Sequence, residues 1–294
     1  MFAVAGATGR VGSATTTALL DAGVAVRVLV RDPARAAGPA RRGAEVTRAD
    51  LTDRSALAAA FTDVDGAFVL LPFDLTAPDL DAHARTLTAA IAGAVRDSGV
   101  PHVVVLSSGG ADLPRGTGPI GGLHDLEEAL RATGAVVTAV RPGHFQEKVA
   151  DVVDLARATG VYPVLAGSAD VPLPLVATRD VGGAAASALL DPPARSQVLD
   201  VLGPAATERE VAAVLGAALG LDLDVVVLPE DAWAGTMVEA GLPSHAAAAV
   251  AELYRADDAG LLAPRGDRVV AGTTPLTETV ARLVAVPVAA PADV

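Results

Sequence analysis

The chain has 294 residues, of which 51% are apolar and 19% are charged, and it contains no cysteine. This composition excludes a disordered or fibrous chain, and the lack of cysteine excludes disulfides, thiolate catalysis and cysteine-ligated metal sites. The 22 basic and 35 acidic residues give a net charge of −13. Because that field repels phosphate backbones, we expect no nucleic-acid partner.

No uncharged apolar stretch approaches the ~20 residues that cross a bilayer. The first residues also lack the basic and apolar regions of a signal peptide. We therefore expect a soluble, cytoplasmic protein that acts on a small molecule and has no membrane partner. The sequence leaves a homodimer open.

In the first half of the chain, short β-branched runs alternate with longer stretches rich in alanine and leucine. Strands are predicted at Phe2–Ala5, Val24–Val30, Ala44–Arg48, Ala67–Leu71, Val103–Ser107 and Val136–Val140. Helices are predicted near 10–22, 33–41, 53–62, 77–98 and 122–133. This alternation is typical of right-handed βαβ units in a parallel sheet that is covered on both faces. We expect Asp53 to cap one helix and Gly99 to end another.

After Val140 the pattern changes, and glycine, proline and polar residues interrupt residues 143–175. Further elements are predicted as a helix at 178–190, a strand at Gln197–Val201, a helix at 208–219, a strand at Asp224–Leu228 and helices near 230–241 and 244–259. The predicted fold is α/β, a Rossmann-type doubly wound parallel sheet with a smaller mixed C-terminal cap. We assign residues 1–144 and about 176–203 to the nucleotide-binding domain, and residues 145–175 and 204–294 to the cap.

Three glycines spaced three apart lie between the first predicted strand and the first predicted helix. In this context Gly6 permits a tight turn, Gly9 lets the backbone approach a pyrophosphate, and Gly12 lets the helix pack against the strand. The helix N-terminus adds free N–H groups and a partial positive charge. The loop predicted to hold the dinucleotide is Gly6, Ala7, Thr8, Gly9, Arg10, Val11 and Gly12.

The end of the second predicted strand bears on which dinucleotide is bound. An acidic residue there selects NAD through the ribose 2′-hydroxyl, whereas this chain reads Val30-Arg31-Asp32-Pro33. A guanidinium suits a 2′-phosphate, and Arg10 is placed to reach the same group. We therefore predict NADP(H) in preference to NAD(H). The alternative is that Arg31 is merely solvated and Asp32 holds the ribose.

At this point the chain resembles a known family, the NmrA-like NAD(P)H-binding group of atypical short-chain dehydrogenase/reductases. The matching stretches are the glycine loop, Val30–Pro33, Ala49–Asp53, Leu70–Pro72, Leu106–Ser108, Glu127–Leu130, Thr138–Phe145, Asp180 in Thr178–Val181, and Gly203-Pro204. The resemblance implies adenine near Asp50 and Leu51. It implies the nicotinamide ribose near Leu70, Leu71, Pro72, Ser107 and Ser108, and substrate under the cap beside His144 and Phe145.

The chain departs from the superfamily in its proton-donor residues. The Tyr-x-x-x-Lys pair is missing, since tyrosine occurs only at 162 and 254. Where similar proteins often read Phe-Met-x-Asn, this chain reads Phe145-Gln146-Glu147-Lys148. The usual proton donor therefore cannot be carried over.

The remaining candidates for catalysis are Ser108, His144 and His124. His124 precedes Glu127 and Glu128 by three and four residues, so on a helix a carboxylate could orient its ring; an exposed ion pair is the alternative. His144 follows a strand end beside the predicted nicotinamide, and an imidazole can deliver a proton at neutral pH. Arg141 is expected in a buried structural ion pair. The five histidines show no paired metal-ligand spacing, so we predict no metal site.

These residues favour an NADPH-dependent reductase of a small organic carbonyl, quinone or conjugated substrate. Two alternatives stay open: a redox-sensing regulator that binds NAD(P) without turnover, and a non-redox cyclase or isomerase that uses the same pocket.

Overall fold

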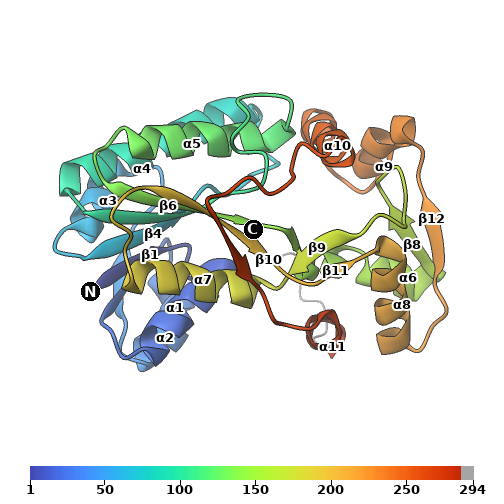
Figure 1. Ribbon diagram of the computed structural model, residues 1–294, viewed down its shortest axis with the longest axis horizontal. Coiled ribbons are helices and arrows are strands. Elements are labelled where there is room, and N and C mark those ends of the chain that lie inside the picture. Colours follow the sequence, from blue (N-terminus) through green and yellow to red (C-terminus); the bar gives the residue numbers. More distant parts are fainter. Residues whose placement is uncertain (286–294) are drawn as a thin grey trace.

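The computed structural model describes residues 1–285 and is built on one large parallel sheet (Figure 1). Its eight strands run in the order β13-β10-β6-β5-β4-β1-β2-β3, and every neighbouring pair is parallel. The strands are β1 (Phe2–Ala5), β2 (Val26–Val30), β3 (Glu45–Arg48), β4 (Gly66–Leu70), β5 (His102–Leu106), β6 (Val136–Pro142), β10 (Gln197–Leu202) and β13 (Arg268–Ala271). This confirms the predicted α/β, Rossmann-type class.

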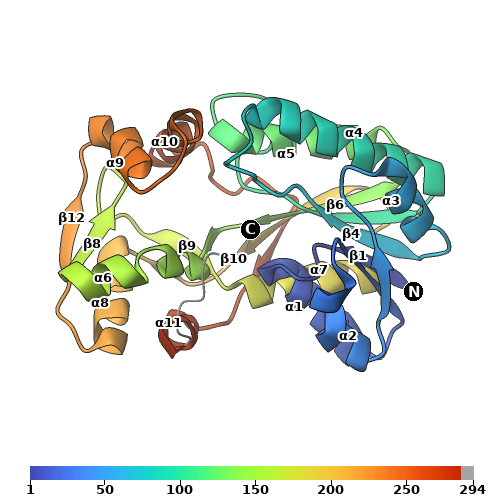
Figure 2. The ribbon, with the colours of Figure 1, turned by 180° about the vertical axis from the view of Figure 1, so that it is seen from behind.

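Helices cover both faces of this sheet (Figures 1 and 2). One layer contains α3 (Arg54–Phe61), α4 (Leu80–Ser98) and α5 (Gly121–Arg131). The other contains α1 (Arg10–Asp21), the short η1 (Pro33–Ala36) and α2 (Ala37–Arg41), and α7 (Thr178–Leu190). Consecutive residues of the central strands pack on opposite faces of the sheet: Phe68 lies in the core beneath α1 and α7, and Val69 in the core beneath α3–α5. Burial on both faces explains why these strands are continuously apolar.

Two helix signals that were predicted from the sequence are present. The Asp53 carboxylate accepts the backbone N–H groups of Ser55 and Ala56 at the start of α3. Gly99 ends α4 in the left-handed conformation with φ +67°, which glycine adopts at little cost.

The cap packs beyond one end of the sheet and has its own small cores. A three-stranded mixed sheet joins β7 (His144–Phe145), β9 (Leu173–Val176) and β11 (Ala205–Ala206), and β8 (Val161–Val164) pairs with β12 (Asp224–Val227). The helical elements around them are η3 (Gln146–Asp151), α6 (Val153–Thr159), α8 (Glu208–Leu219), η4 (Glu230–Ala232), α9 (Trp233–Glu239), α10 (Ser244–Asp258) and α11 (Leu276–Ala285).

One strand lies outside the domain that the sequence predicted for it. Residues 268–271, grouped above with the cap, form β13 and pair with β10 at the edge of the main sheet. The strand has only four residues and its Val269 is 64% exposed. It therefore lacks the long apolar run by which the buried strands were predicted. The two-domain division remains a prediction, and residues 286–294 of the predicted cap lie outside the described residues.

No helix within residues 1–285 is long and apolar enough to cross a membrane.

Candidate active site

The carboxyl ends of the parallel strands gather the predicted cofactor residues at one edge of the sheet. The chain continues from β1 to β2 on one side and returns to β4 on the other, so the β1–β4 boundary is a topological switch point. Ligands of doubly wound sheets bind in the crevice outside such a point. The glycine loop follows β1, Leu70–Pro72 end β4, and Ser107-Ser108 follow β5.

The three glycines of the loop have different steric surroundings. Gly6 has φ +64°, and a Cβ there would lie 2.4 Å from Leu70 Cδ2. At Gly12 a Cβ would lie 2.2 Å from the Gly6 carbonyl oxygen, so the helix can approach the turn only with glycine. A Cβ at Gly9, in contrast, would meet nothing closer than that same oxygen, at 3.4 Å. This matches the turn and packing roles predicted for Gly6 and Gly12 and leaves open space beside Gly9.

The first turn of α1 offers backbone donors at this loop. Gly9 is the N-cap residue and supplies no side-chain hydrogen bond, so no side chain caps the free N–H groups of the turn. Free N–H groups and the helix dipole together attract phosphate. The loop residues present therefore fit a dinucleotide pyrophosphate.

Arg31 and Asp32, which directly follow β2, have different environments. The Asp32 carboxylate accepts the Ala34 N–H at 3.0 Å and thereby caps η1. Arg31 is exposed beside Asp50. Hydrogen bonds from Thr52, followed by the charge of Arg31, hold the pKa of the Asp50 carboxyl below its usual value. The Arg31 guanidinium is thus exposed at the strand ends, whereas the Asp32 carboxylate is held by a hydrogen bond within a turn.

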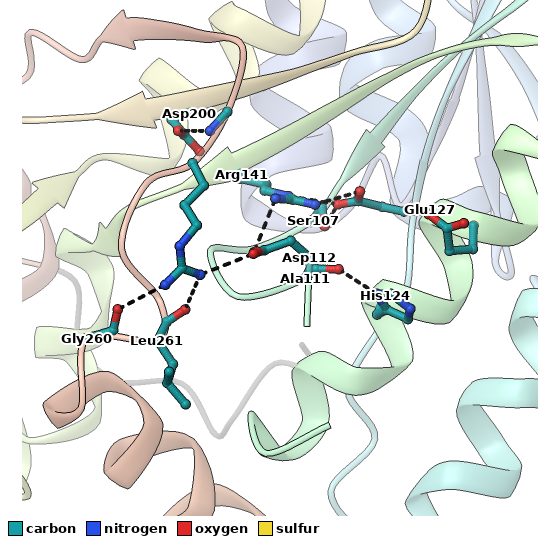
Figure 3. Close-up of polar contacts among 12 residues, drawn as sticks. Ser107, Ala111, Asp112, His124, Glu127, Arg141, Asp200, Gly260 and Leu261 are labelled. Atoms are coloured by element: carbon teal, nitrogen blue, oxygen red, sulfur yellow. Dashed lines mark hydrogen bonds and ion pairs between the residues drawn. The ribbon is translucent and has the colours of Figure 1, made fainter. Parts of the chain in front are cut away.

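Ser107 is buried in an ionic network beneath the predicted nicotinamide position (Figure 3). Its hydroxyl donates to Glu127 of α5, whose carboxylate also binds Arg141 through Nε at 3.0 Å and Nη2 at 2.8 Å. Arg131 adds a third cation contact to Glu127, at 2.6 Å. The structural ion pair expected for Arg141 is therefore present. Since Ser107 is occupied, Ser108, which is half-buried, is the serine that remains for a ligand.

The prediction that a carboxylate orients His124 is wrong. Its Nδ1 lies 2.9 Å from the Ala111 carbonyl oxygen (Figure 3). Because a carbonyl only accepts, this nitrogen carries the proton. Glu127 is held by Arg141 instead, and Glu128 binds Arg131 at 2.7 Å. Helical spacing alone could not show that stronger cation partners take both carboxylates.

His144, by contrast, has a carboxylate partner that the sequence did not reveal. Its Nε2 lies 3.4 Å from Oδ2 of Asp257 on α10. The adjoining Phe145 is half-buried against the α1–α7 core. The two predicted substrate residues thus lie between the main sheet and the cap.

The residues where this chain departs from the superfamily pattern make structural contacts. The Glu147 carboxylate is buried and accepts both the backbone N–H and the hydroxyl of Thr178 at the start of α7. Gln146 donates to the Thr274 carbonyl and accepts the Thr279 hydroxyl. Lys148 is exposed, with Nζ 5.0 Å from the centre of the Tyr254 ring.

Tyr162 is unsuited to act as an acid. It lies in the cap core, where its hydroxyl donates to Glu208 at 2.6 Å. Burial and then the charge of Glu208 raise the pKa of Tyr162 far above its ordinary value.

We call residues 244–262, which comprise α10 and the turn after it, the roof segment. It rests on the loops that follow β4 and β5. A Cβ at Gly118 would lie 2.2 Å from the Ala249 carbonyl oxygen, and one at Gly109 would lie 2.3 Å from that of Leu262. His245 also contacts the Ala77 carbonyl at 2.8 Å. The roof segment therefore covers the carboxyl edge of the sheet on the side of β4 and β5.

The comparisons with known proteins agree with this architecture. The model of the NmrA-like family matches residues 1–260. The chain belongs to the NmrA-like family. Curated relatives of the chain are named as reductases or oxidoreductases.

Two relatives and one solved structure illustrate the similarity. The chain is 31% identical over 256 residues to an NAD(P)H azoreductase of Xenophilus azovorans, covering 86% of both proteins. It is 35% identical over 234 residues to a (4-alkanoyl-5-oxo-2,5-dihydrofuran-3-yl)methyl phosphate reductase of Streptomyces griseus, covering 79% of this chain and 78% of the relative. The structure of Citrobacter sp. triphenylmethane reductase complexed with NADP(H) has a TM-score of 0.79 at 24% identity, covering 96% of this chain and all of that one. At this level of identity, the similarity to the triphenylmethane reductase shows a shared fold.

Proposed function

We propose that the chain is an NADPH-dependent reductase that transfers a hydride to a small organic carbonyl, quinone or conjugated substrate. The observation that carries this proposal is the glycine loop at the switch point. Gly9 leaves room for a phosphate, and the uncapped first turn of α1 supplies donors for it. The nicotinamide, when bound, supplies the hydride; the chain positions it and binds the acceptor.

The preference for NADPH over NADH rests on the two residues after β2. A guanidinium binds a phosphate with charge-assisted hydrogen bonds, and Arg31 is exposed at the strand ends. A ribose-binding acid would need a free carboxylate, whereas that of Asp32 caps η1. We propose Arg31, with Arg10 from the glycine loop, as the groups that hold the 2′-phosphate.

On the acceptor side, we propose that substrate lies beneath the roof segment beside His144 and Phe145. We include Ser108, which is half-buried after β5, and Phe73 after β4, which is 37% exposed. Half-buried aromatic side chains favour a flat, conjugated molecule. The names of the two relatives also point to such acceptors, since they refer to an azo group and to an oxo-dihydrofuran. A cytoplasmic location is part of this proposal and accords with the absence of cysteine.

A cofactor-oxidation screen tests the proposal. NADPH absorbance is followed with purified protein and four acceptors: a benzoquinone, an unsaturated lactone, an azo dye and a simple ketone. We expect turnover with at least one conjugated acceptor and the slowest rate with the simple ketone. Tight binding of NADPH without turnover of any acceptor would instead favour the regulator, which the missing Tyr-x-x-x-Lys pair also permits.

A further inference from the structure

The contact between His144 and Asp257 joins the small mixed sheet to the roof segment. Nε2 of His144 and Oδ2 of Asp257 are 3.4 Å apart, and the two side chains are 21% and 23% exposed. Each side chain is thus shielded from most solvent and still reachable from the site. An imidazole in this position has a carboxylate on one nitrogen and a second nitrogen left for another partner.

The backbone on both sides of His144 is held in place. His144 is paired with Leu175 in the small mixed sheet. The N–H of the preceding Gly143 donates to Val201 at 2.9 Å, and a Cβ at Gly143 would lie 2.4 Å from the Pro174 carbonyl oxygen. The position of the ring is therefore set by the main sheet and the small sheet together.

A second contact connects the same two segments. Lys148 lies four residues after His144, and its ammonium lies over the ring of Tyr254, three residues before Asp257 on α10. Residues three or four apart share a face of a helix, so Tyr254 and Asp257 are presented to residues 144–148 together. The two contacts together favour one rotation of α10 about its own axis, in which Tyr254 and Asp257 face residues 144–148.

Four other charged groups on the packed elements have partners of their own. On α10, Asp258 accepts the Gly167 N–H at 2.7 Å. On η3, Glu147 accepts from Thr178, and Lys148 stacks on Tyr254. On β6, Arg141 is bound to Glu127. Asp257 is the carboxylate that the structure places against the His144 ring.

We propose that Asp257 is the positioning residue that makes His144 the proton donor of the reduction. This inference rests on the proposed reductase function. The carboxylate, 3.4 Å from Nε2, favours the ring orientation in which Nε2 faces α10 and Nδ1 is left for the substrate.

The reduction then balances in atoms and charge. NADPH, when bound, would supply the hydride, with its two electrons, that the electrophilic carbon of the acceptor receives. The acceptor oxygen takes the electron pair of its broken π bond and receives a proton from Nδ1 of His144. His144 becomes neutral and regains its proton from solvent. Asp257 stays ionised throughout and forms no covalent bond.

The test compares pH profiles of kcat and of KM in matched variants. With the best acceptor of the screen, we expect Asp257→Asn to lower kcat about tenfold at pH 8, with KM for NADPH within about threefold of wild type. The loss should appear across the whole pH profile of kcat, because the ring has lost the carboxylate that orients it. Asp257→Glu should restore part of kcat and of the profile.

Asp258→Asn is the matched control, because it removes the same charge from the same helix one residue later. Its profile should follow wild type. Circular dichroism and melting temperature confirm that each variant is folded. A signal independent of activity is the ¹⁵N resonance of the His144 imidazole, assigned by its loss in His144→Gln. In wild type it should report a proton on Nε2 in the neutral ring, and Asp257→Asn should lower the share of that tautomer.

The outcomes separate this inference from the proposed function. If acceptors are reduced and Asp257→Asn keeps the wild-type profile, the role of Asp257 is wrong and the reductase function stands. If Tyr254→Phe lowers kcat tenfold while Asp257→Asn does not, the phenol is the donor and the inference is overturned. If no acceptor is reduced by wild type, the reductase function itself fails, and the acid role fails with it.

Discussion

The Glu127 carboxylate and the Arg141 guanidinium form a two-point ion pair in which both side chains are almost fully buried, 1% and 4% exposed. Two oxygens of one group face two nitrogens of the other, a geometry that lysine cannot reproduce. The pair joins α5 to β6 directly beneath Ser107.

Replacing Arg141 with methionine should therefore be costly to stability. The change leaves the buried Glu127 charge with only Arg131 to compensate it, and breaking a buried pair on one side typically costs about 3–5 kcal/mol. We expect the free energy of unfolding, measured by urea denaturation, to fall by about 3 kcal/mol. Arg131→Met, at a one-third exposed partner, should cost clearly less. If Arg141→Met and Arg131→Met cost the same unfolding free energy, the burial of Arg141 does not strengthen its ion pair with Glu127.

Gly9→Val and Gly12→Val should have opposite consequences. A side chain at Gly9 meets open space, so the protein should keep its melting temperature and lose NADPH binding, because the valine occupies the approach of the pyrophosphate. A side chain at Gly12 meets the Gly6 carbonyl at 2.2 Å, so that variant should melt at a clearly lower temperature. Calorimetry and fluorescence titration with NADPH measure the two effects. A Gly9→Val protein that binds normally would contradict the cofactor position.

Arg31→Ala should remove the preference for NADPH. Two charge-assisted contacts to the 2′-phosphate correspond to about 1.5–3 kcal/mol, so wild type should bind NADPH at least about tenfold tighter than NADH. In the variant, affinity for NADPH should fall while affinity for NADH stays constant. Asp32→Asn keeps an acceptor for the Ala34 N–H and serves as control. An unchanged preference in Arg31→Ala would instead support Asp32 as the ribose ligand.

His102 should make the fold sensitive to mild acid. It is buried against Thr138, with 3.0 Å between Nε2 and the hydroxyl oxygen, and burial lowers its pKa below the ordinary value of 6.5. In the unfolded chain the ring takes up a proton near pH 6.5, whereas the folded ring stays neutral to lower pH. The stability contributed by the neutral ring is therefore lost as pH falls below 6.5.

Replacing His102 with glutamine should flatten this dependence. Between pH 6.5 and 5, the loss of unfolding free energy should be smaller in the variant, by up to about 1.4 kcal/mol per pH unit. His245→Gln, at an exposed histidine, is the control and should keep the wild-type slope. Equal slopes in wild type and His102→Gln would mean that the buried ring does not contribute.

Much of the fold was accessible from the sequence because its signals are local. A strand buried on both faces is a continuous apolar run, and helix ends carry residues such as Asp53 and Gly99 whose side chain or conformation suits the end. The glycine spacing predicted the loop for the same reason, since Gly6 is required by the adjoining strand and Gly12 by a neighbour close in sequence. The short strands β7, β8, β9 and β13 have two to four residues and no such run.

The contacts of the site were less predictable because they join distant segments. Helical spacing favoured Glu127 as the partner of His124, but Arg141 from the next strand binds that carboxylate instead. Asp257 follows His144 by more than a hundred residues, and only the packing of α10 over the loops that follow β4 and β5 brings the two together. The sequence identified the candidate histidine and could not identify its partner.

The return of the chain to the main sheet at β13 affects how the cap could be exchanged between homologues. The cap is attached through its entry after β6 and again through a strand that shields the edge of β10. A fragment ending before residue 268 would expose the backbone hydrogen-bonding groups of β10, and such bare edges promote aggregation. A chimaera should therefore retain β13 with its host sheet, beside β10.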